Sequence, residues 1–492
     1  MDTPNLRRRS VSSRALVAVC ALVAISVSLQ GAAPVDPAAE VATAKYLVSI
    51  RNNPSLLLAF LAEMPKGGDL HNHLSGAIYA ESYLRWAADD NLCLVTAAMA
   101  IGPAPCDAAA GRPPAATVFQ NTALFSQAID AMSMRHWDLS LNGHDHFFAT
   151  FGKFGLASTK TGEMLAEVAA RAAAEHVSYL ELMLTPATTA TARLALQAGW
   201  DPNLASLRDT LLAAGFRAAV TEEAKMRLDA GEARQREILH CGATQADPGC
   251  RVTVRYISQV ARATPPAQVF AQMLAGFELA TQEPRVVGLN LVQPEDDPIA
   301  VRDFSLQMSM LDFLHGLYPT VRITLHAGEL VEGLVPPETL RSHIRASVRT
   351  GHALRIGHGA GVMYEDDALG LLREMASKRV LVEIALTSND LILGIKGKRH
   401  PLQTYLKYGV PVALVTDDAG VSRSSLTLEY SKAVEEQGLD YRTLKRMARN
   451  SLEFAFADEA TKKRLRSELD AAFRAFELSV SRQAAARDRR PH

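Results

Sequence analysis

Two histidines one residue apart, His71 and His73, end the apolar run "GGDLHNHL" at residues 67–74. Side chains alternate between the two faces of a strand, so both imidazoles would point to the same side. Imidazole nitrogens bind transition metals, and two of them on one strand can face one ion. Because such a pair is common by chance, other parts of the chain must supply the remaining ligands.

Polar residues also end three later apolar runs. His326 and Glu329 lie in "HAGE", His358 lies in "GHG", and Asp417 and Asp418 lie in "TDD". The two aspartates are neighbours on an extended chain and therefore point to opposite sides. One of them can bind a metal while the other reaches a different group.

Eight apolar runs alternate with longer helical patterns. These predicted strands cover residues 67–74, 178–185, 251–260, 285–292, 321–329, 354–359, 380–389 and 410–418. Strands that alternate with helices pair in parallel, and eight such units predict an α/β fold, the (β/α)8 or TIM barrel. Barrel enzymes carry their active sites at the carboxyl ends of the strands, where the polar residues described above are found.

Such a barrel would bring the polar residues into one metal site. His326 would add a third nitrogen to those of His71 and His73, and Asp417 would add an oxygen. Three histidines and one carboxylate suit Zn²⁺ and leave one position for water. Each residue alone could instead cap the next helix, but the four together favour a metal site.

Three regions depart from the regular alternation. Residues 92–120, rich in Pro and Gly, predict an insertion after the first strand, and residues 231–250 predict a shorter one. The tail, residues 481–492, is predicted to be disordered. A second His-x-His pair, His144 and His146, follows no predicted strand, so we expect it to pack or to line an apolar pocket.

The composition is that of a globular protein, with 48% hydrophobic and 21% charged residues among 492. The formal net charge is −1 and no long basic stripe is present, which argues against nucleic-acid binding. Neither charge nor composition predicts the oligomeric state.

The first 33 residues predict a secretory signal peptide. An arginine-rich start precedes the short apolar segment 15–29, which is followed by small residues. We therefore expect an exported protein, periplasmic or extracellular, whose barrel domain covers residues 34–480. The apolar run is short for a membrane span, so we expect no stable membrane insertion after removal of the signal. An uncleaved N-terminal anchor is the alternative.

Four cysteines follow the signal segment: Cys93, Cys106, Cys241 and Cys250. An even number in an exported chain favours disulfides. Three pairings are possible, of which the local one, Cys93–Cys106 with Cys241–Cys250, closes two loops. The alternative is that some of these thiols stay free.

Five motifs, "MPKGGDLHNHLSGA", "HAGE", "RIGHG", "TSND" and "VTDD", in this order resemble the adenosine deaminase family of metal-dependent hydrolases. The resemblance runs from Met64 to "NSLEFAFA" at residues 450–457, and the signal peptide and insertion resemble secreted members. It implies one Zn²⁺ per chain. The implied ligands are His71, His73, His326 and Asp417.

The resemblance also implies roles for the other polar residues. Glu329 would pass a proton to purine N1, and His358 would orient the attacking water and help to deprotonate it. Asp418 would hydrogen-bond purine N7, and Gly76 would contact the ribose through its backbone. The implied reaction is the hydrolytic deamination of adenosine, and of 2′-deoxyadenosine, to inosine and ammonia. The implied partner is a small-molecule nucleoside.

Two departures bear on the substrate. Ser75 stands where the family has an acidic residue that contacts the sugar 5′-hydroxyl, and Gln293 stands where a glycine offers its N–H to the purine. Another 6-aminopurine nucleoside is therefore an alternative substrate. A nucleotide is less favoured, because no cluster of Arg or Lys lies near Ser75. A catalytically inactive binding protein on the same scaffold is a third possibility. Such a protein would be expected to lack a metal-ligand residue or Glu329, but all of these residues are present.

Overall fold

The computed structural model describes residues 37–138 and 143–488, so the predicted signal peptide lies outside the described residues. Two four-stranded parallel sheets, with orders β1-β4-β5-β6 and β7-β8-β9-β10, form the centre. Bridges between Leu289 and Ile323 and between Asn72 and Asp417 join the two sheets at both edges. The predicted (β/α)8 barrel is confirmed. The barrel strands are β1 Gly67–His73, β4 Val177–Leu184, β5 Thr253–Ala261, β6 Val286–Val292, β7 Thr324–Ala327, β8 Arg355–His358, β9 Leu381–Ile384 and β10 Val412–Leu414.

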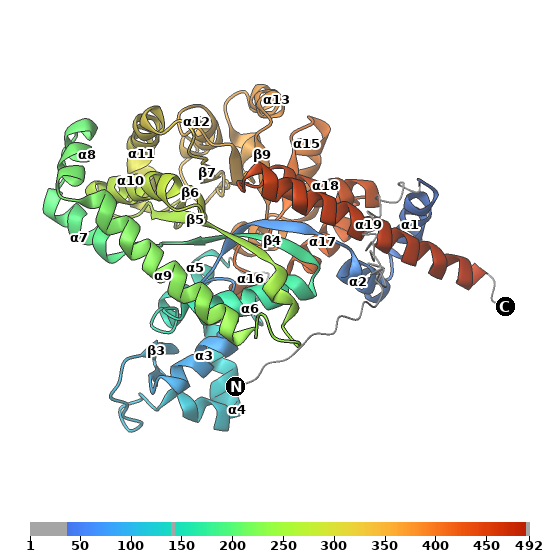
Figure 1. The fold of residues 1–492 in the computed structure, drawn as a ribbon, viewed down its shortest axis with the longest axis horizontal. Coiled ribbons are helices and arrows are strands. Elements are labelled where there is room, and N and C mark those ends of the chain that lie inside the picture. The colour runs from blue at the N-terminus through green and yellow to red at the C-terminus, as the bar shows by residue number, and fades with distance from the viewer. Residues whose placement is uncertain (1–36, 139–142, 489–492) are drawn as a thin grey trace, which may run out of the picture. The chain divides into compact units, whose positions relative to one another are not determined.

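The helices lie outside the strands, so the barrel is covered on its outer face (Figure 1). Strands such as β6 (VVGLNLV) and β10 (VAL) are largely apolar because both of their faces are buried, whereas β1 (GGDLHNH) is buried but mostly polar. None of the described helices is long and apolar enough to cross a membrane. The α-helices are α1 Pro37–Ile50, α2 Pro54–Glu63, α3 Ala80–Asp89, α4 Thr122–Ala131, α5 His144–Phe154, α6 Thr161–Ala174, α7 Thr189–Ala198, α8 Leu204–Ala213, α9 Phe216–Ile238, α10 Pro266–Gln282, α11 Pro298–Leu317, α12 His343–Arg349, α13 Ala368–Lys378, α14 Leu386–Leu393, α15 Leu402–Lys407, α16 Ala419–Ser422, α17 Leu426–Glu435, α18 Tyr441–Glu453 and α19 Glu459–Asp488. The short 3₁₀ helices are η1 Ala115–Gln120, η2 Pro248–Arg251, η3 Thr339–Arg341, η4 Val362–Tyr364 and η5 Gly397–Arg399.

The insertion after β1 contains a small antiparallel pair, β2 Cys93–Val95 and β3 Ala100–Gly102. Cys93 is bonded to Cys106 with a Cα–Cα distance of 5.4 Å, and Cys241 is bonded to Cys250 with a distance of 5.6 Å. The local disulfide pairing is thus confirmed, and it closes one loop in each of the two irregular regions.

The second irregular region is shorter than predicted. Helix α9 continues to Ile238, because the segment 231–238, "GEARQREI", consists mostly of good helix formers. Helix α19 likewise continues to Asp488, into the predicted tail 481–492, where the alanine-rich "QAAARD" has high helix propensity. Disorder of this tail in solution stays a prediction.

The seventh predicted strand is also shorter in the structure. β9 ends at Ile384 and α14 begins at Leu386, so the "TSND" motif lies on a helix. The carboxylate of Glu429, which is fully buried, accepts hydrogen bonds from the Thr387 N–H at 3.2 and 3.3 Å. A carboxylate at this end satisfies an unpaired N–H group and suits the helix dipole, which stabilises the early helix start.

Candidate active site

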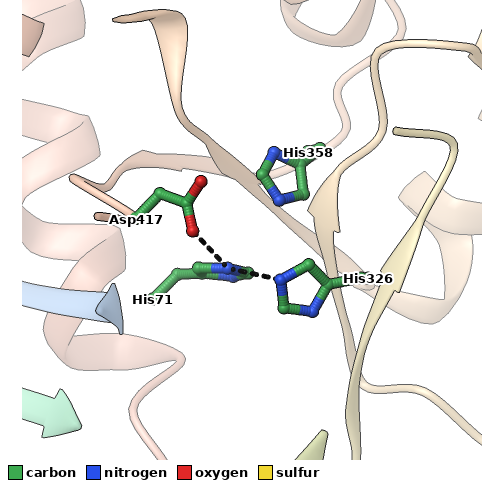
Figure 2. A group of neighbouring side chains, drawn as sticks. All are labelled: His71, His326, His358 and Asp417. Atoms are coloured by element: carbon green, nitrogen blue, oxygen red, sulfur yellow. Dashed lines mark hydrogen bonds and ion pairs between the residues drawn. The ribbon is translucent and has the colours of Figure 1, made fainter. Parts of the chain in front are cut away.

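Three imidazole nitrogens and one carboxylate oxygen converge at the carboxyl ends of the strands. The Nε2 of His326 lies 3.1 Å from that of His71 and 3.2 Å from that of His73. The Oδ1 of Asp417 lies 3.4 and 3.3 Å from the same two nitrogens. Figure 2 shows His71, His326 and Asp417 pointing toward one another, with His358 beside them. Ligands 2.0–2.1 Å from a tetrahedral Zn²⁺ are about 3.3 Å apart, so the donor set fits this ion.

The other ring nitrogen of each histidine has its own partner. For His71 and His326 this partner is an acceptor, which holds the ring proton on Nδ1 and leaves Nε2 free to bind a metal, whereas at His73 the amide nitrogen of Gln259 faces Nδ1. The Nδ1 contacts are Glu383 Oε2 at 2.7 Å for His71, the Gln259 amide at 3.1 Å for His73 and Asn290 Oδ1 at 3.0 Å for His326.

Local backbone features make room for this cluster. A Cβ at Gly357 on β8 would lie 2.7 Å from Cε1 of His71, so glycine leaves the space that the imidazole ring occupies. His358 and Asp417 have φ values of 66° and 62°, in the left-handed region that non-glycine residues seldom adopt. The Ser388 hydroxyl donates to Oδ2 of Asp417 at 2.6 Å, which leaves Oδ1 for the cluster. Left-handed backbone conformations such as those of His358 and Asp417 concentrate at functional sites.

Three buried polar atoms beside the cluster have no hydrogen-bond partner among the described residues: Oε1 of Glu329, Nε2 of His358 and Oδ1 of Asp418. Burial raises the pKa of Glu329 well above its usual value, and the nearby Asp417 and Glu295 carboxylates raise it further. Burial also raises the pKa of Asp418, and it lowers the pKa of His358 to about 4. Unpaired buried polar atoms are costly, so these three are placed to meet a polar ligand or water.

The residues beside the cluster line a cavity of about 420 Å³. One wall is aromatic and comes from α5, which supplies Phe147, Phe148 and Phe151. The remaining lining residues are His73, Ser75, Gln259, Val292, Gln293, Pro294, His326, Glu329, Ile392, Asp417 and Asp418. The cavity has the size of a small-molecule site and combines an apolar wall with polar groups at the metal-ligand cluster.

The second His-x-His pair lies at the start of α5 and does not resemble a metal site. His144 Nε2 is 3.0 Å from Oδ1 of Asp296, and His146 Nε2 is 3.0 Å from the carbonyl oxygen of Ser133. The His146 ring also stacks on Trp137, with ring centres 4.5 Å apart. These contacts agree with packing, one of the two expected roles, whereas neither histidine is among the residues that line the cavity.

Residues 146–472 match the profile of the family described as adenosine deaminase. The chain belongs to the adenosine deaminase family. The first motif of the adenosine deaminase family, with His71 and His73, precedes the matched segment. The fold nevertheless places both histidines within 3.2 Å of His326, which lies inside it.

Two curated adenosine deaminases show the extent of the sequence similarity. The enzyme of Enterococcus faecalis is 31% identical over 195 residues, which is 39% of this chain and 52% of that protein. The enzyme of Salmonella typhi is 36% identical over 151 residues, which is 30% of this chain and 42% of that protein. The aligned part thus spans about half the length of these relatives.

Solved structures show the same fold over most of the chain. The N6-mAMP deaminase of Arabidopsis has a TM-score of 0.56 at 21% identity and covers 84% of this chain and 99% of that one. An amidohydrolase of Burkholderia ambifaria with bound Zn has a TM-score of 0.54 at 17% identity, with 86% and 94% coverage. At these identities the likeness is one of fold.

The structure explains one of the two departures from the adenosine deaminase family pattern. Gln293 has a φ of 81°, which is a conformation that suits the glycine expected at this position. Its side-chain Oε1 accepts a hydrogen bond from the N–H of Ala263 at 2.9 Å, which ties the side chain to the loop after β5. The backbone at this position therefore keeps the shape expected of a glycine.

We expect the change Gln293→Gly to keep kcat/KM within about threefold. The change removes a left-handed conformation that costs a side-chain-bearing residue of the order of 1 kcal/mol, but it also removes the hydrogen bond to Ala263. Steady-state kinetics of the two proteins test this expectation. A hundredfold loss would mean that the Gln293 side chain, and not the backbone, serves the substrate.

Ser75 and Gly76 follow β1, which ends at His73. A Cβ on Gly76 would lie 1.5 Å from Oδ1 of Asp418, so no other residue fits unless Asp418 moves. The Gly76 carbonyl accepts hydrogen bonds from the N–H groups of Gly420 and Val421 at 2.9 and 3.0 Å. Ser75 is half-buried and lines the cavity.

Glu295 is a site residue that the sequence did not reveal to us. Its carboxylate is buried and accepts hydrogen bonds from the N–H groups of Gly328 at 3.2 Å and Glu329 at 2.7 Å. It also lies 2.6 Å from Nδ1 of His343. These contacts of the Glu295 carboxylate hold the backbone turn that carries Glu329. The available signal was the acidic "PEDD" segment directly after a predicted strand.

Proposed function

We propose that this protein is a zinc-dependent deaminase that hydrolyses adenosine and 2′-deoxyadenosine to inosine and ammonia. The convergence of the four ligand atoms beside the buried Glu329 carboxyl, whose Oε1 has no hydrogen-bond partner among the described residues, carries this proposal. One Zn²⁺ per chain would be held by His71, His73, His326 and Asp417. When bound, it would supply Lewis acidity, which makes water a nucleophile near neutral pH.

The remaining groups have complementary tasks in this proposal. The Glu329 carboxyl, with its raised pKa, can hold the proton that ring nitrogen N1 must receive as C6 is attacked. The Asn389 amide donates to Nδ1 of His358 at 3.0 Å, so the neutral ring carries its proton on Nε2, from which it can hydrogen-bond and orient the attacking water. Asp418, when protonated, can donate a hydrogen bond to N7, which is an acceptor.

The charges around the cavity favour a nucleoside over a nucleotide. Its described lining residues include Glu329, Asp417 and Asp418, and no Lys or Arg. A phosphate would therefore meet carboxylates and aromatic rings without the cations that commonly recognise it.

A substrate panel with an ammonia readout tests the proposed function. Adenosine, 2′-deoxyadenosine, AMP and a second 6-aminopurine nucleoside are compared on one zinc-loaded preparation, and we expect kcat/KM for adenosine to exceed that for AMP by at least about a hundredfold. A preference for AMP or for the second nucleoside would overturn the substrate assignment. No turnover of any substrate by folded, zinc-loaded protein would favour the inactive binding scaffold.

The sugar 5′-hydroxyl should contribute little to turnover. A carboxylate accepts a charge-assisted hydrogen bond from a hydroxyl, whereas Ser75 makes a weaker neutral one. We therefore expect kcat/KM for 5′-deoxyadenosine to be within about tenfold of that for adenosine, which corresponds to about 1.4 kcal/mol. A thousandfold preference for adenosine would show that another residue holds the 5′-hydroxyl.

We also propose that residues 1–33 are a signal peptide and that the protein is exported. The two disulfides of the described chain support this proposal, since disulfides persist in oxidising compartments. The mature protein should begin near residues 31–35 and carry the Cys93–Cys106 bridge. N-terminal sequencing that finds Met1, or non-reducing peptide mapping that finds both thiols free, would contradict it.

A further inference from the structure

Below the metal-ligand cluster, the barrel interior holds three charged side chains with no solvent exposure: Glu181 on β4, Arg355 on β8 and Glu383 on β9. Arg355 Nη2 lies 2.6 Å from Oε2 of Glu181, and Arg355 Nε lies 2.6 Å from Oε1 of Glu383. Oε2 of Glu383 in turn lies 2.7 Å from Nδ1 of His71. A continuous chain of charged contacts thus leads from Glu181 to a residue of the proposed metal site.

The two oxygens of Glu383 face different partners. Oε2 meets His71, while Oε1 forms an ion pair with Arg355 Nε that lacks hydrogen-bond geometry and accepts a hydrogen bond from the Thr324 hydroxyl at 3.0 Å. The terminal torsion of a glutamate is soft, so contacts at one oxygen decide where the other points. Arg355 therefore sets the direction from which Glu383 approaches the His71 ring.

Arg355 itself is fixed on several sides. Its guanidinium stacks 3.8 Å from the centre of the Phe456 ring, and its Nη1 donates to the Phe454 carbonyl at 3.0 Å. Its partner Glu181 accepts hydrogen bonds from the Tyr179 hydroxyl at 2.7 Å and from the Phe456 N–H at 2.5 Å. A planar, rigidly held guanidinium suits the orientation of a carboxylate better than a flexible ammonium group does.

Charge makes the arrangement sensitive to loss of Arg355. Two buried carboxylates share this one guanidinium, and a buried carboxylate that loses its partner is strongly disfavoured. Without Arg355, the Glu383 carboxylate would reorient, and the ring of His71 would lose the contact that orients it.

We propose that Arg355 is a metal-positioning residue, which acts through Glu383 on His71 and so sets the affinity for Zn²⁺ without touching the ion. This inference rests on the metal site of the proposed function. It does not depend on the identity of the substrate.

Arg322 offers a matched control. Its Nη1 donates to the carbonyls of Phe456 and Ala457, the latter at 3.0 Å, and its guanidinium lies 5.9 Å from the centre of the Phe456 ring. It thus anchors the same segment of the chain as Arg355 does, but its described contacts do not include Glu383.

The experiment compares Arg355→Met with Arg322→Met in the full zinc-loaded chain. Zn²⁺ is the probe, and its dissociation constant is measured by competition with a chromogenic chelator, with thermal melting of each variant as a check of folding. We expect Arg355→Met to weaken zinc binding by about 10–100-fold, the usual effect of losing a group behind a metal ligand, and Arg322→Met by less than about threefold. Equal affinities in the two variants would overturn the proposal.

A double variant tests the route through Glu383. Glu383→Gln should weaken zinc binding to a similar degree, and adding Arg355→Met to it should cost less than about threefold more, because both changes act on the same ring. Full additivity of the two losses would contradict an action through Glu383.

If Arg355→Met does not fold, Arg355→Lys decides the question. A lysine meets one carboxylate well and the other poorly, so we expect zinc binding at least about fivefold weaker, and an unchanged affinity would overturn the proposal. A parent protein that deaminates no nucleoside but binds Zn²⁺ leaves these expectations in place. A parent protein that binds no Zn²⁺ overturns the inference together with the metal site.

Discussion

Replacing Glu329 with glutamine should lower kcat for adenosine by roughly 10²–10⁴-fold, while the protein keeps its zinc. Glutamine has nearly the same shape and can keep the backbone hydrogen bonds to Glu295, but it cannot carry the proton that N1 must receive. Oε1 of Glu329 is buried, has no hydrogen-bond partner among the described residues and lies 3.5 Å from Nδ1 of His358, which fits a group that meets the substrate. Steady-state kinetics and elemental analysis of the same preparation provide the two readouts.

Glu332 provides the matched control for this variant. It lies three residues further along the same loop and is exposed, and it does not line the cavity. Glu332→Gln should change kcat by less than about twofold. Near-normal turnover of Glu329→Gln would remove Glu329 from the mechanism.

Replacing His326 with alanine should abolish both zinc binding and activity. His326 Nε2 lies within 3.2 Å of the Nε2 atoms of His71 and His73, so its loss removes a corner of the cluster. We expect the zinc content to fall from about one per chain to near zero. Turnover should fall more than about 10⁴-fold, because water would then react with a pKa near 16 instead of about 7.

His315, on α11 outside the barrel, provides the comparison for this second variant. Its ring stacks on His352, with ring centres 4.0 Å apart, and has no contact with the cluster. His315→Ala should therefore retain its zinc and its activity. Full zinc in His326→Ala would contradict the assignment of the ligands.

The four proposed ligands could be predicted because the alternation of apolar runs and helical patterns in the sequence predicts the barrel topology. His71, His73, His326 and Asp417 end apolar runs, and parallel strands that close into a barrel bring those ends together. A long-range contact such as that between His71 and Asp417 needs only the strand order and the direction of side chains.

The sequence predicts less about the buried charged residues that support the proposed metal ligands. Glu383 and Glu181 interrupt the apolar runs of β9 and β4, and a charge in a strand buried on both faces signals a buried ion pair. The sequence does not tell which partner each charge has, because Arg355 joins them through the barrel interior. The conformation of Gln293, with a φ of 81°, was equally hidden, and so was the hydrogen bond that its side chain accepts from Ala263, thirty residues away in the sequence.

The boundary between β9 and α14 shows a different limit. The run at residues 380–389, "VLVEIALTSN", is apolar enough for one long strand, and short apolar runs fit a strand or a buried helix equally well. The helix start at Leu386 depends on the carboxylate of Glu429, which lies more than forty residues away in the sequence. A contact of this kind comes from tertiary structure and overrides the local pattern.

The most direct test of a zinc-dependent adenosine deaminase is ammonia release from adenosine by the same purified protein before metal removal, after it, and after Zn²⁺ is added back. We predict that removal abolishes turnover and that about one equivalent of Zn²⁺ per chain restores it, whereas Mg²⁺ does not. Turnover that survives complete metal removal, or no turnover by folded protein that carries one Zn²⁺, would contradict the proposal.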